Sequence, residues 1–460
     1  MIRHHVSTAT LASTLFAATL AGAAGVPGSS EGNPFVESSA GRAWQRITFG
    51  AIDCGADLAE ASAFCPNDAF SQSGVFVNGT YRDIRFVYAG AAPGGPNSAD
   101  YLLNRVINQS QTFPQASSAS GFTFTWNGPT PTLDSEMFGP LFGNRGRTNG
   151  RGKLSATLSV QTLKWEKLDG SSVRNGEAGL DWGDHAYADF GSGPAGYVGR
   201  CRMDIDSMVA SASVTYGVSD RLDISAGVPL VHTRIEGSNE FLDYVVLPGG
   251  RVSIDPADTG FAPQGRFFVE GSSTGIGDAM VGVTYALSKK ERSALALTGG
   301  ANLGTGSFEK MTGTGETQWR LGIVGSHERR RFAPHFSASY FGANDDLFDE
   351  ARGVVGLDVR AVPNRLTLSA ELLARRLMGV QGFAEGNAFA TVRSPLTGET
   401  MPVREYAAAR DDHNLYFVTL GGKWRAAGQI LVTGFVLVPF GDSGLVAQKP
   451  SWNLGANYAF

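Results

Sequence analysis

From Arg151 to the last residue, the chain consists of segments in which apolar side chains alternate with small or polar ones. Alternation with a period of two is typical of β-strands, because successive side chains of a strand point to opposite faces. Turn residues separate twelve such segments, at about residues 151–168, 203–217, 220–236, 276–288, 291–305, 315–330, 331–343, 352–361, 364–378, 410–425, 427–440 and 449–460. The sequence therefore predicts an all-β chain of about twelve antiparallel strands.

The connections between these segments alternate between short and long. Five are short turns, such as Val218-Ser219-Asp220 and Val362-Pro363-Asn364. The six long connections cover about residues 169–202, 237–275, 306–314, 344–351, 379–409 and 441–448. Outer-membrane barrels have tight periplasmic turns and long external loops. We therefore expect residues 151–460 to form a transmembrane antiparallel β-barrel in the cell outer membrane of a Gram-negative bacterium.

The last segment separates its two faces most clearly. Its apolar face, suited to lipid, carries Trp452, Leu454, Ala456, Tyr458 and Phe460. The aromatic ending resembles the recognition signal that barrel-assembly machinery reads in the C-terminal strand. Aromatic residues near strand ends are expected at the membrane interfaces, with ordinary strand aromatics as the alternative. The predicted interface residues are Tyr216, Tyr285, Trp319, Trp424, Tyr458 and Phe460.

Charged side chains occur on the face that alternation assigns to the barrel interior. The predicted lumen-lining residues are Asp223, Asp278, Arg320, His335, Asp358, Arg360, Glu371, Arg375, His413 and Lys423. Both signs are present, and buried charges must be paired or hydrated. Asp358, Arg360, Glu371 and Arg375 are predicted to lie on adjacent strands, where they could form one ladder. The group is either a structural network or the selectivity lining of a narrow pore.

One strand has two apolar faces. In 427–440, Leu431, Phe435 and Leu437 oppose Ile430, Val432 and Val436. This strand either packs against a plug inside the barrel or lines a part of the lumen that suits an apolar solute.

The first 150 residues are organised differently. Residues 1–23 have a basic start, a short apolar run and the small-residue pattern Ala21-Gly22-Ala23, which is typical of a signal peptide. Residues 24–150, rich in glycine, proline and serine, are expected to form a periplasmic extension or a plug. Cys54 and Cys65 are predicted to form a disulfide in an oxidising compartment. This pairing leaves Cys201 without a cysteine partner, and no metal site is expected.

Composition narrows the functional classes. The net charge of −5 gives no basic surface for nucleic acid. No Gly-x-Ser-x-Gly motif or phosphate-binding loop occurs, so neither an enzyme nor a cofactor is expected. An outer-membrane hydrolase remains an alternative because His185 and His413 each follow an aspartate, although a catalytic triad requires spatial geometry.

The segment Tyr216-Gly217-Val218-Ser219-Asp220-Arg221-Leu222-Asp223, followed by Gly227-Val228-Pro229-Leu230, resembles a known group. Gly275-Ile276-Gly277-Asp278, with Gly282 and Tyr285, continues the similarity. The group is the outer-membrane family named for the meta-pathway of phenol degradation, and the resemblance covers about residues 203–460. It implies a barrel that admits small, often aromatic, compounds.

The predicted function is passage of a small solute, with hydrophobic or aromatic compounds as one class. The main alternative is a non-transporting surface or structural barrel whose long loops bind a partner. Expected partners are outer-membrane lipid and lipopolysaccharide, the barrel-assembly machinery and the solute. The sequence does not choose an oligomeric state.

Overall fold

The computed structural model describes short stretches between residues 74 and 142 and most of 146–459. Within the second range, it leaves out residues 169, 177–194, 249–250, 256–264, 309, 344–346, 395–397, 442 and 447–449. The predicted signal peptide, the predicted disulfide and Phe460 lie outside the described residues.

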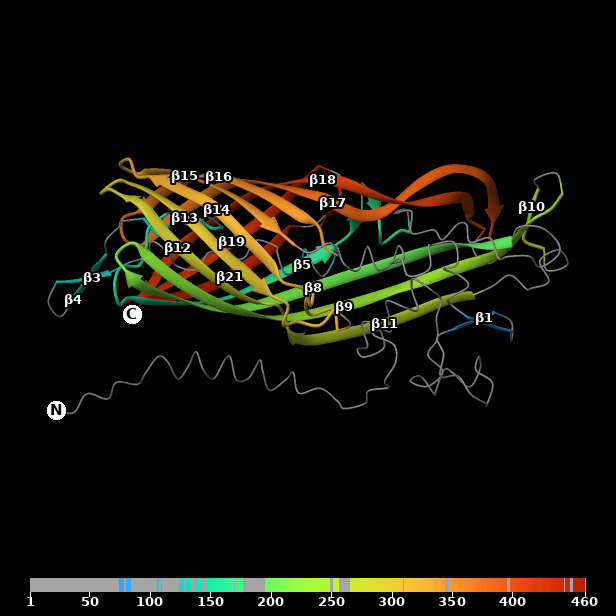
Figure 1. Ribbon diagram of the computed structural model, residues 1–460, viewed down its shortest axis with the longest axis horizontal. Helices are drawn as coiled ribbons and strands as arrows, with labels where there is room; N and C mark the ends of the chain where they lie inside the picture. The colour runs from blue at the N-terminus through green and yellow to red at the C-terminus, as the bar shows by residue number, and fades with distance from the viewer. Residues whose placement is uncertain are drawn as a thin grey trace.

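Twelve antiparallel strands close into a barrel (Figure 1). They are β5 (Leu154–Trp165), β8 (Ala195–Ser219), β9 (Leu222–Val246), β12 (Ala279–Lys289), β13 (Ser293–Leu303), β14 (Gln318–His327), β15 (Phe332–Gly342), β16 (Asp349–Val362), β17 (Leu366–Arg393), β18 (Thr400–Ala427), β19 (Ile430–Phe440) and β21 (Ser451–Ala459). Strand β21 pairs with β5, and β5 with β8, so the last strand closes the barrel onto the first. The predicted all-β barrel of twelve strands is confirmed.

The short turns lie at one end of the barrel, which we call the turn side, and the long connections lie at the opposite, loop side. Arg330 and Asn364, both in short turns, adopt φ values of 56° and 57°. Tight turns between strands often require such left-handed conformations. The C-terminal end of β21 also lies on the turn side (Figure 1).

The outer surface of the barrel is apolar. Trp452 and Leu454 are each 64% exposed, whereas Asn453 and Asn457 between and beside them are buried. The same alternation exposes Val214, Ile224, Val281, Val283, Leu297, Leu321, Phe336, Val355, Leu357, Leu368, Leu372, Val418, Leu420 and Val438. An apolar belt of this extent around a closed barrel is the surface that lipid covers.

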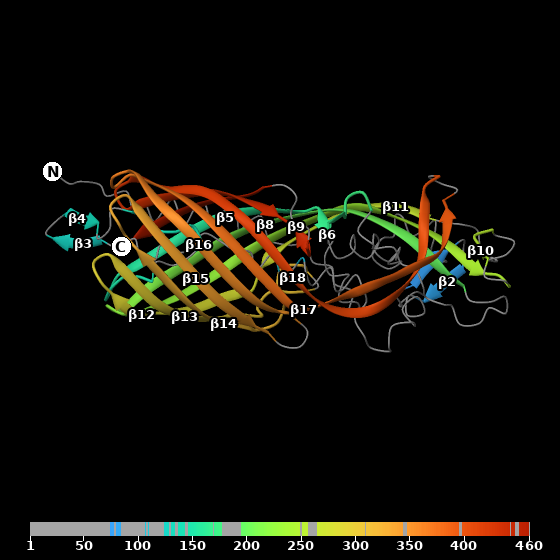
Figure 2. The same cartoon turned by 90° about the horizontal axis from the view of Figure 1, so that it is seen from above.

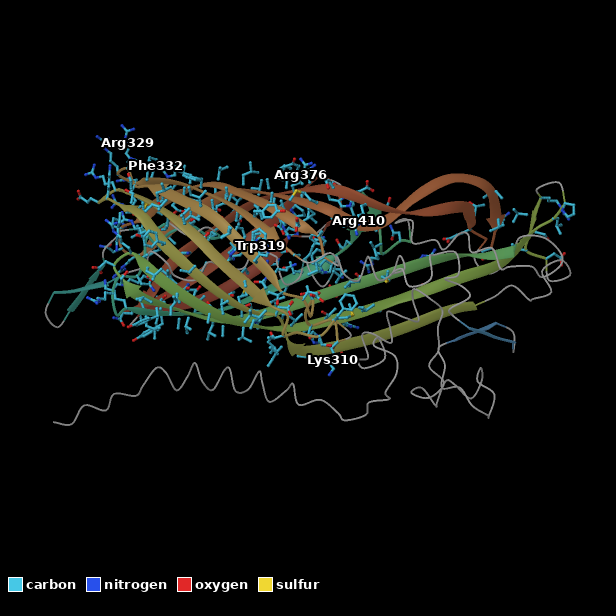
Figure 3. The ribbon with its side chains drawn as sticks, viewed as in Figure 1. Lys310, Trp319, Arg329, Phe332, Arg376 and Arg410 are labelled. Atoms are coloured by element: carbon cyan, nitrogen blue, oxygen red, sulfur yellow. The ribbon has the colours of Figure 1, made fainter. Side chains whose placement is uncertain are left out.

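Exposed aromatic residues mark the two borders of this belt. Phe332 lies at the turn-side end, whereas Trp319, the second residue of β14, lies nearer the loop side (Figure 3). Trp319 packs beside Tyr340 with ring centroids 5.5 Å apart. Of the predicted interface residues, Tyr216, Tyr285, Trp319 and Trp424 are exposed, and Tyr458 is partly exposed.

Several connections predicted as loops are continuations of strands. Strands β8 and β9 have 25 residues each, and β17 and β18 have 28 each. About 9–11 residues suffice to cross a membrane, so these strands continue well beyond the barrel on the loop side (Figures 1 and 2). Alternation weakens where a strand leaves the lipid, which is why the sequence pattern indicated loops over much of 237–275 and 379–409.

Strand β11 (Gly265–Ile276) precedes β12 along the same edge of β9. Strand β9 pairs with β12 through residues 222–227 and with β11 through residues 230–241. Between them, the Gly277 amide donates a hydrogen bond to the Pro229 carbonyl. The predicted strand 276–288 therefore corresponds to β12 and the last residue of β11, and β11 extends the pairing with β9 toward the loop side.

Smaller sheets complete the described structure. Strands β1 (Gly74–Val77) and β2 (Thr80–Asp83) form one hairpin, and β3 (Phe124–Asn127) and β4 (Thr130–Leu133) form another. Strands β6 (Lys167–Leu168), β7 (Ser171–Ser172) and β20 (Leu445–Val446) form a third sheet, and β10 (Val252–Ser253) pairs with β9. None of the described residues forms a helix that is both long and apolar enough to span a membrane.

Candidate functional site

The chain segment that precedes the first barrel strand crosses the barrel interior. We call residues 137–142 and 146–150 the lumen segment. Its first part is buried against the inner wall formed by β17, β18 and β19. The Phe138 amide donates to Thr367 Oγ1 at 3.1 Å, and Lys423 Nζ donates to the Pro140 carbonyl at 2.6 Å. Side chains of the wall therefore bind the main chain of the segment directly.

Glu371 on β17 binds two main-chain amides of the segment. Its Oε1 accepts from the Leu141 amide at 2.5 Å, and its Oε2 accepts from the Phe142 amide at 3.3 Å. The buried Leu141 amide thereby has an acceptor, as a buried main-chain donor requires.

Apolar packing supports the same contact. Leu141 and Phe435 are both buried, and the Phe142 ring meets the Phe435 ring edge-on with centroids 4.7 Å apart. Phe435 lies on the inner face of β19. Of the two explanations for the double apolar face of this strand, packing against a chain segment inside the barrel applies at Phe435.

The second part of the lumen segment binds the opposite wall near the short turns. The Asn149 amide donates to Asp223 Oδ2 at 2.8 Å, and Asn149 Nδ2 donates to the Thr215 carbonyl at 3.2 Å. Thr148 Oγ1 donates to the Asp220 carbonyl at 2.6 Å. The segment thus reaches from β17–β19 to β8 and β9 across the turn side of the lumen.

Two glycines permit this close approach. A Cβ on Gly217 would lie 1.9 Å from the Gly150 carbonyl oxygen. A Cβ on Gly146, which has φ of 72°, would lie 3.0 Å from the Val324 carbonyl oxygen. Gly217 belongs to the segment that carries the family resemblance, so its role there is to admit the lumen segment beside the strand.

Glu371 and two buried ionisable side chains beside it, His335 and Asp358, form what we call the turn-side layer. His335 Nε2 lies 3.3 Å from Glu371 Oε1, and His335 Nδ1 lies 3.7 Å from Asp358 Oδ2. Ser369 Oγ donates to Asp358 Oδ1 at 2.7 Å. A protonated His335 would pair with both carboxylates, and a buried charge is tolerated only with such partners.

The same three residues are of types that bind metal ions, and their candidate ligand atoms lie within 4.8 Å of one another. However, both oxygens of Glu371 already accept amide hydrogens from the lumen segment. In the described structure, this layer therefore acts as a holder of the lumen segment.

A second group, which we call the loop-side layer, consists of Arg320, Phe341, Glu350, Arg352 and Arg375. Arg375 binds Glu350 through two hydrogen bonds of 2.8 and 2.7 Å, and Arg352 Nε donates to Glu350 Oε1 at 2.7 Å. The guanidinium of Arg352 lies 4.4 Å from the centroid of the Phe341 ring, and that of Arg320 lies 5.8 Å from it. This layer is therefore rich in guanidinium groups.

The predicted lumen residues lie in different parts of the barrel, some in the two layers and others outside them. Of the four residues expected to form one ladder, Arg375 lies in the loop-side layer and Asp358 and Glu371 lie in the turn-side layer. Arg360 is partly buried on β16. Asp278 anchors the connection between β13 and β14, because its carboxylate accepts from the amides of Gly306 and Thr314.

Of the two histidines considered for a hydrolase, His413 is buried, with Nδ1 3.4 Å from Ser443 Oγ. His185 and the side chain of Cys201 lie outside the described residues. No observation in the described part of the chain favours a hydrolase.

The sequence-based prediction missed Glu350 and Arg352 in the loop-side layer. It began the strand at residue 352, whereas β16 begins at Asp349. Arg352 is the first residue of the predicted strand and has the same parity as Asp358, but it was not included among the lumen residues; extending the alternation by two residues would have added Glu350 to the inner face. The lumen segment carries no periodic pattern, so its strand contacts could not be predicted. The sequence indicated only that residues 24–150 form either a periplasmic extension or a plug.

A closed antiparallel barrel with an apolar belt, aromatic borders and a charged interior is an outer-membrane β-barrel. The chain matches the family model described as "Putative MetA-pathway of phenol degradation" over residues 206–353. This match confirms the resemblance predicted from the sequence. No curated protein matches the chain.

Solved structures of outer-membrane proteins resemble the barrel. An outer-membrane channel from Pseudomonas putida F1 shares 12% identity, with a TM-score of 0.41, over 68% of this chain and 98% of its own. The TodX monoaromatic hydrocarbon channel shares 13% identity, with a TM-score of 0.32, over 75% of this chain and 98% of its own. A FadL homologue of Pseudomonas aeruginosa shares 12% identity, with a TM-score of 0.28, over 69% and 91%.

Proposed function

We propose that this protein is an outer-membrane channel for a small solute, and that the lumen segment closes its turn side. The observation that carries the proposal is the binding of this segment by Glu371 and Lys423 across the barrel interior. These contacts are non-covalent, so the segment can leave. Barrels of eight strands are filled by side chains and those of sixteen or more hold water. Twelve strands suit a narrow passage that a short segment can close.

The solute is proposed to be hydrophobic or aromatic in part. Leu431, Phe435 and Leu437 are apolar side chains on the inner face of β19 and are buried in the closed state; Phe435 would be uncovered when the lumen segment leaves, which favours solutes with an apolar body. The family model matched by residues 206–353 is described in terms of phenol degradation, and this description supports an aromatic compound. Passage of a solute without chemical conversion requires no catalytic group. The absence of enzymatic activity stays a prediction.

Further partners follow from the proposed location. Lipid covers the apolar belt, and lipopolysaccharide would contact the loop side. Strand β21 would engage the barrel-assembly machinery during insertion. The hairpin of β3 and β4 lies at the turn side (Figures 1 and 2), which supports a periplasmic position for residues 124–133, whereas the hairpin of β1 and β2 lies beside the strand extensions on the loop side.

The channel hypothesis is tested by single-channel recording in planar bilayers. We would compare the full chain with a variant in which residues 137–142 are replaced by a Gly-Ser linker of equal length. The variant is expected to show conductance steps, because it loses the contacts to Thr367, Glu371 and Lys423. The full chain is expected to be silent or to open rarely. A variant that folds, judged by its heat-modifiable mobility on gels, yet stays silent would contradict the proposal.

A second candidate function is partner binding by the strand extensions. Arg202 on β8 pairs with Glu399, at the end of the β17–β18 hairpin, at 2.6 Å. This ion pair links two extensions beyond the barrel, which gives the loop side a defined surface. Shortening β17 and β18 to the barrel rim would abolish partner capture if this were the main function, while leaving conductance unchanged.

A further inference from the structure

The loop-side layer brings together three guanidinium groups. Arg320 on β14, Arg352 on β16 and Arg375 on β17 contribute them, and Glu350 contributes a carboxylate that pairs with Arg352 and Arg375. A charge removed from water is costly without a counter-charge, so a guanidinium that has no carboxylate partner among the described residues is the group best able to bind an anion.

Glu350 is already fully engaged. Its two oxygens accept three hydrogen bonds from Arg375 and Arg352, and the bidentate contact to Arg375 has planar geometry suited to a carboxylate. Within the described part of the chain, no carboxylate forms an ion pair with Arg320. Its recorded neighbour is the Phe341 ring, at 5.8 Å from the guanidinium to the centroid. A cation–π contact at that distance attracts a cation but does not neutralise it.

The barrel wall leaves space for the Arg320 side chain. A Cβ on Gly300 would lie 3.2 Å from Arg320 Nη2, and a Cβ on Gly282 would lie 3.6 Å from it. Gly300 pairs with Arg320 across β13 and β14, and Gly282 pairs with Gly300 across β12 and β13. Two neighbouring glycines thus form a recess in which the guanidinium lies along the wall.

Arg320 and Arg352 are directed to the same aromatic ring. Arg352 lies over Phe341 at 4.4 Å while its Nε remains on Glu350. Strand pairing explains this arrangement, because Phe341 is the direct partner of both Arg320 and Glu350. Two cations therefore border one apolar surface on the loop side, where a solute would arrive first.

We propose that this layer binds the anionic group of a small organic carboxylate, with Arg320 as its principal ligand. A guanidinium presents a rigid set of donors that matches a carboxylate in two parallel hydrogen bonds. The apolar body of the solute would lie on the lumen side of Phe341. This inference rests on the proposed channel function and narrows its solutes from apolar compounds in general to aromatic or aliphatic acids.

The test is equilibrium binding of radiolabelled benzoate to the full-length protein in detergent at neutral pH, with protein-free micelles as the blank. Benzyl alcohol and benzylammonium serve as neutral and cationic compounds of the same size. The variants are Arg320→Gln and, as a matched control, Arg376→Gln. Arg376 neighbours Arg375 on β17, but it is exposed on the outer surface and pairs with Asp412 (Figure 3).

We expect benzoate to bind more tightly than either other compound. Arg320→Gln should weaken benzoate at least about tenfold, as expected for loss of a charge-assisted hydrogen bond, and Arg376→Gln should leave it unchanged. Equal binding of benzoate and benzyl alcohol, or equal benzoate binding by wild type and Arg320→Gln, would overturn the inference. A folded Arg320→Lys variant that retains binding better than Arg320→Gln would support it.

Conductance separates this inference from the channel proposal. Silence of the linker variant together with Arg320-dependent benzoate binding would reject the channel and keep the carboxylate site. Conductance without Arg320-dependent binding would keep the channel and reject the site.

Discussion

The turn-side and loop-side layers of the lumen share strands β15, β16 and β17, yet they have opposite charge patterns. Strand β16 contributes Asp358 to one layer and Glu350 and Arg352 to the other, and β17 contributes Glu371 and Arg375. Four residues, about 13 Å along a strand, separate the carboxylate of Glu371 from the guanidinium of Arg375. The charge of the interior side chains therefore changes with position along the barrel, from carboxylates on the turn side to guanidinium groups on the loop side.

The difference lies in what each layer binds. The turn-side carboxylate of Glu371 accepts amide hydrogens from the chain itself, so its ligand is always present at high effective concentration. In the described part of the chain, no main-chain segment binds the loop-side layer, and the guanidinium of Arg320 in that layer forms no ion pair with a carboxylate. We infer that a closure element and a solute-binding element share one wall and can be altered separately.

The largest expected effect is that of Glu371→Ala, which removes the acceptor for the Leu141 and Phe142 amides and the partner of His335. Leaving a buried polar group without its partner costs about 1–3 kcal/mol, and because Glu371 has several such partners we expect a loss of at least about 3 kcal/mol in urea unfolding. The full-length variant should also show conductance steps like those of the linker variant, with benzoate binding unchanged.

The matched control for this prediction is Asp412→Asn on the neighbouring strand. Asp412 pairs with Arg376 on the exposed surface, where an ion pair contributes little. A stable, silent Glu371→Ala variant would break the comparison, because the turn-side layer would then not be the holder of the segment.

An intermediate effect is expected for Phe435→Ala. Phe435 is buried against Leu141 and meets the Phe142 ring at 4.7 Å, so truncation leaves a cavity beside the segment. Large-to-small substitutions of this kind cost about 3 kcal/mol. We expect openings in single-channel records to become more frequent but to stay brief, because Glu371 and Lys423 still hold the segment.

Val438→Ala is the control for this substitution, since Val438 lies on the same strand but is exposed on the outer face. Equal loss of stability in both variants would indicate that Phe435 contributes through the barrel wall alone.

Much of this architecture could be predicted from the sequence. The alternation of apolar and polar residues gave all twelve barrel strands, because lipid outside and charge inside impose a strict period of two. Beyond the membrane this constraint is lost. The extensions of β8, β9, β17 and β18 therefore looked like loops, although hydrogen bonding continues along them.

The site was harder to predict than the fold. Parity placed Glu371, Arg375 and Lys423 on the inner face, but it could not assign their partners. Glu371 and Lys423 bind main-chain groups of the lumen segment, more than 200 residues away in sequence. Main-chain acceptors and donors are the same in every residue, so no residue type marks the segment as their ligand.

The smallest effect that would still sharpen the comparison is that of Thr367→Val. Thr367 Oγ1 accepts from the Phe138 amide at 3.1 Å, at a fully buried position. Valine preserves the shape of the side chain but removes the acceptor, so one amide loses its partner at a cost of about 1 kcal/mol. In urea unfolding, the variant should be destabilised by about that amount, and benzoate binding should remain at the wild-type value because Arg320 lies in the other layer. A change in benzoate binding without a change in stability would show that the two layers are coupled through the strands they share, and the separation argued above would then be wrong.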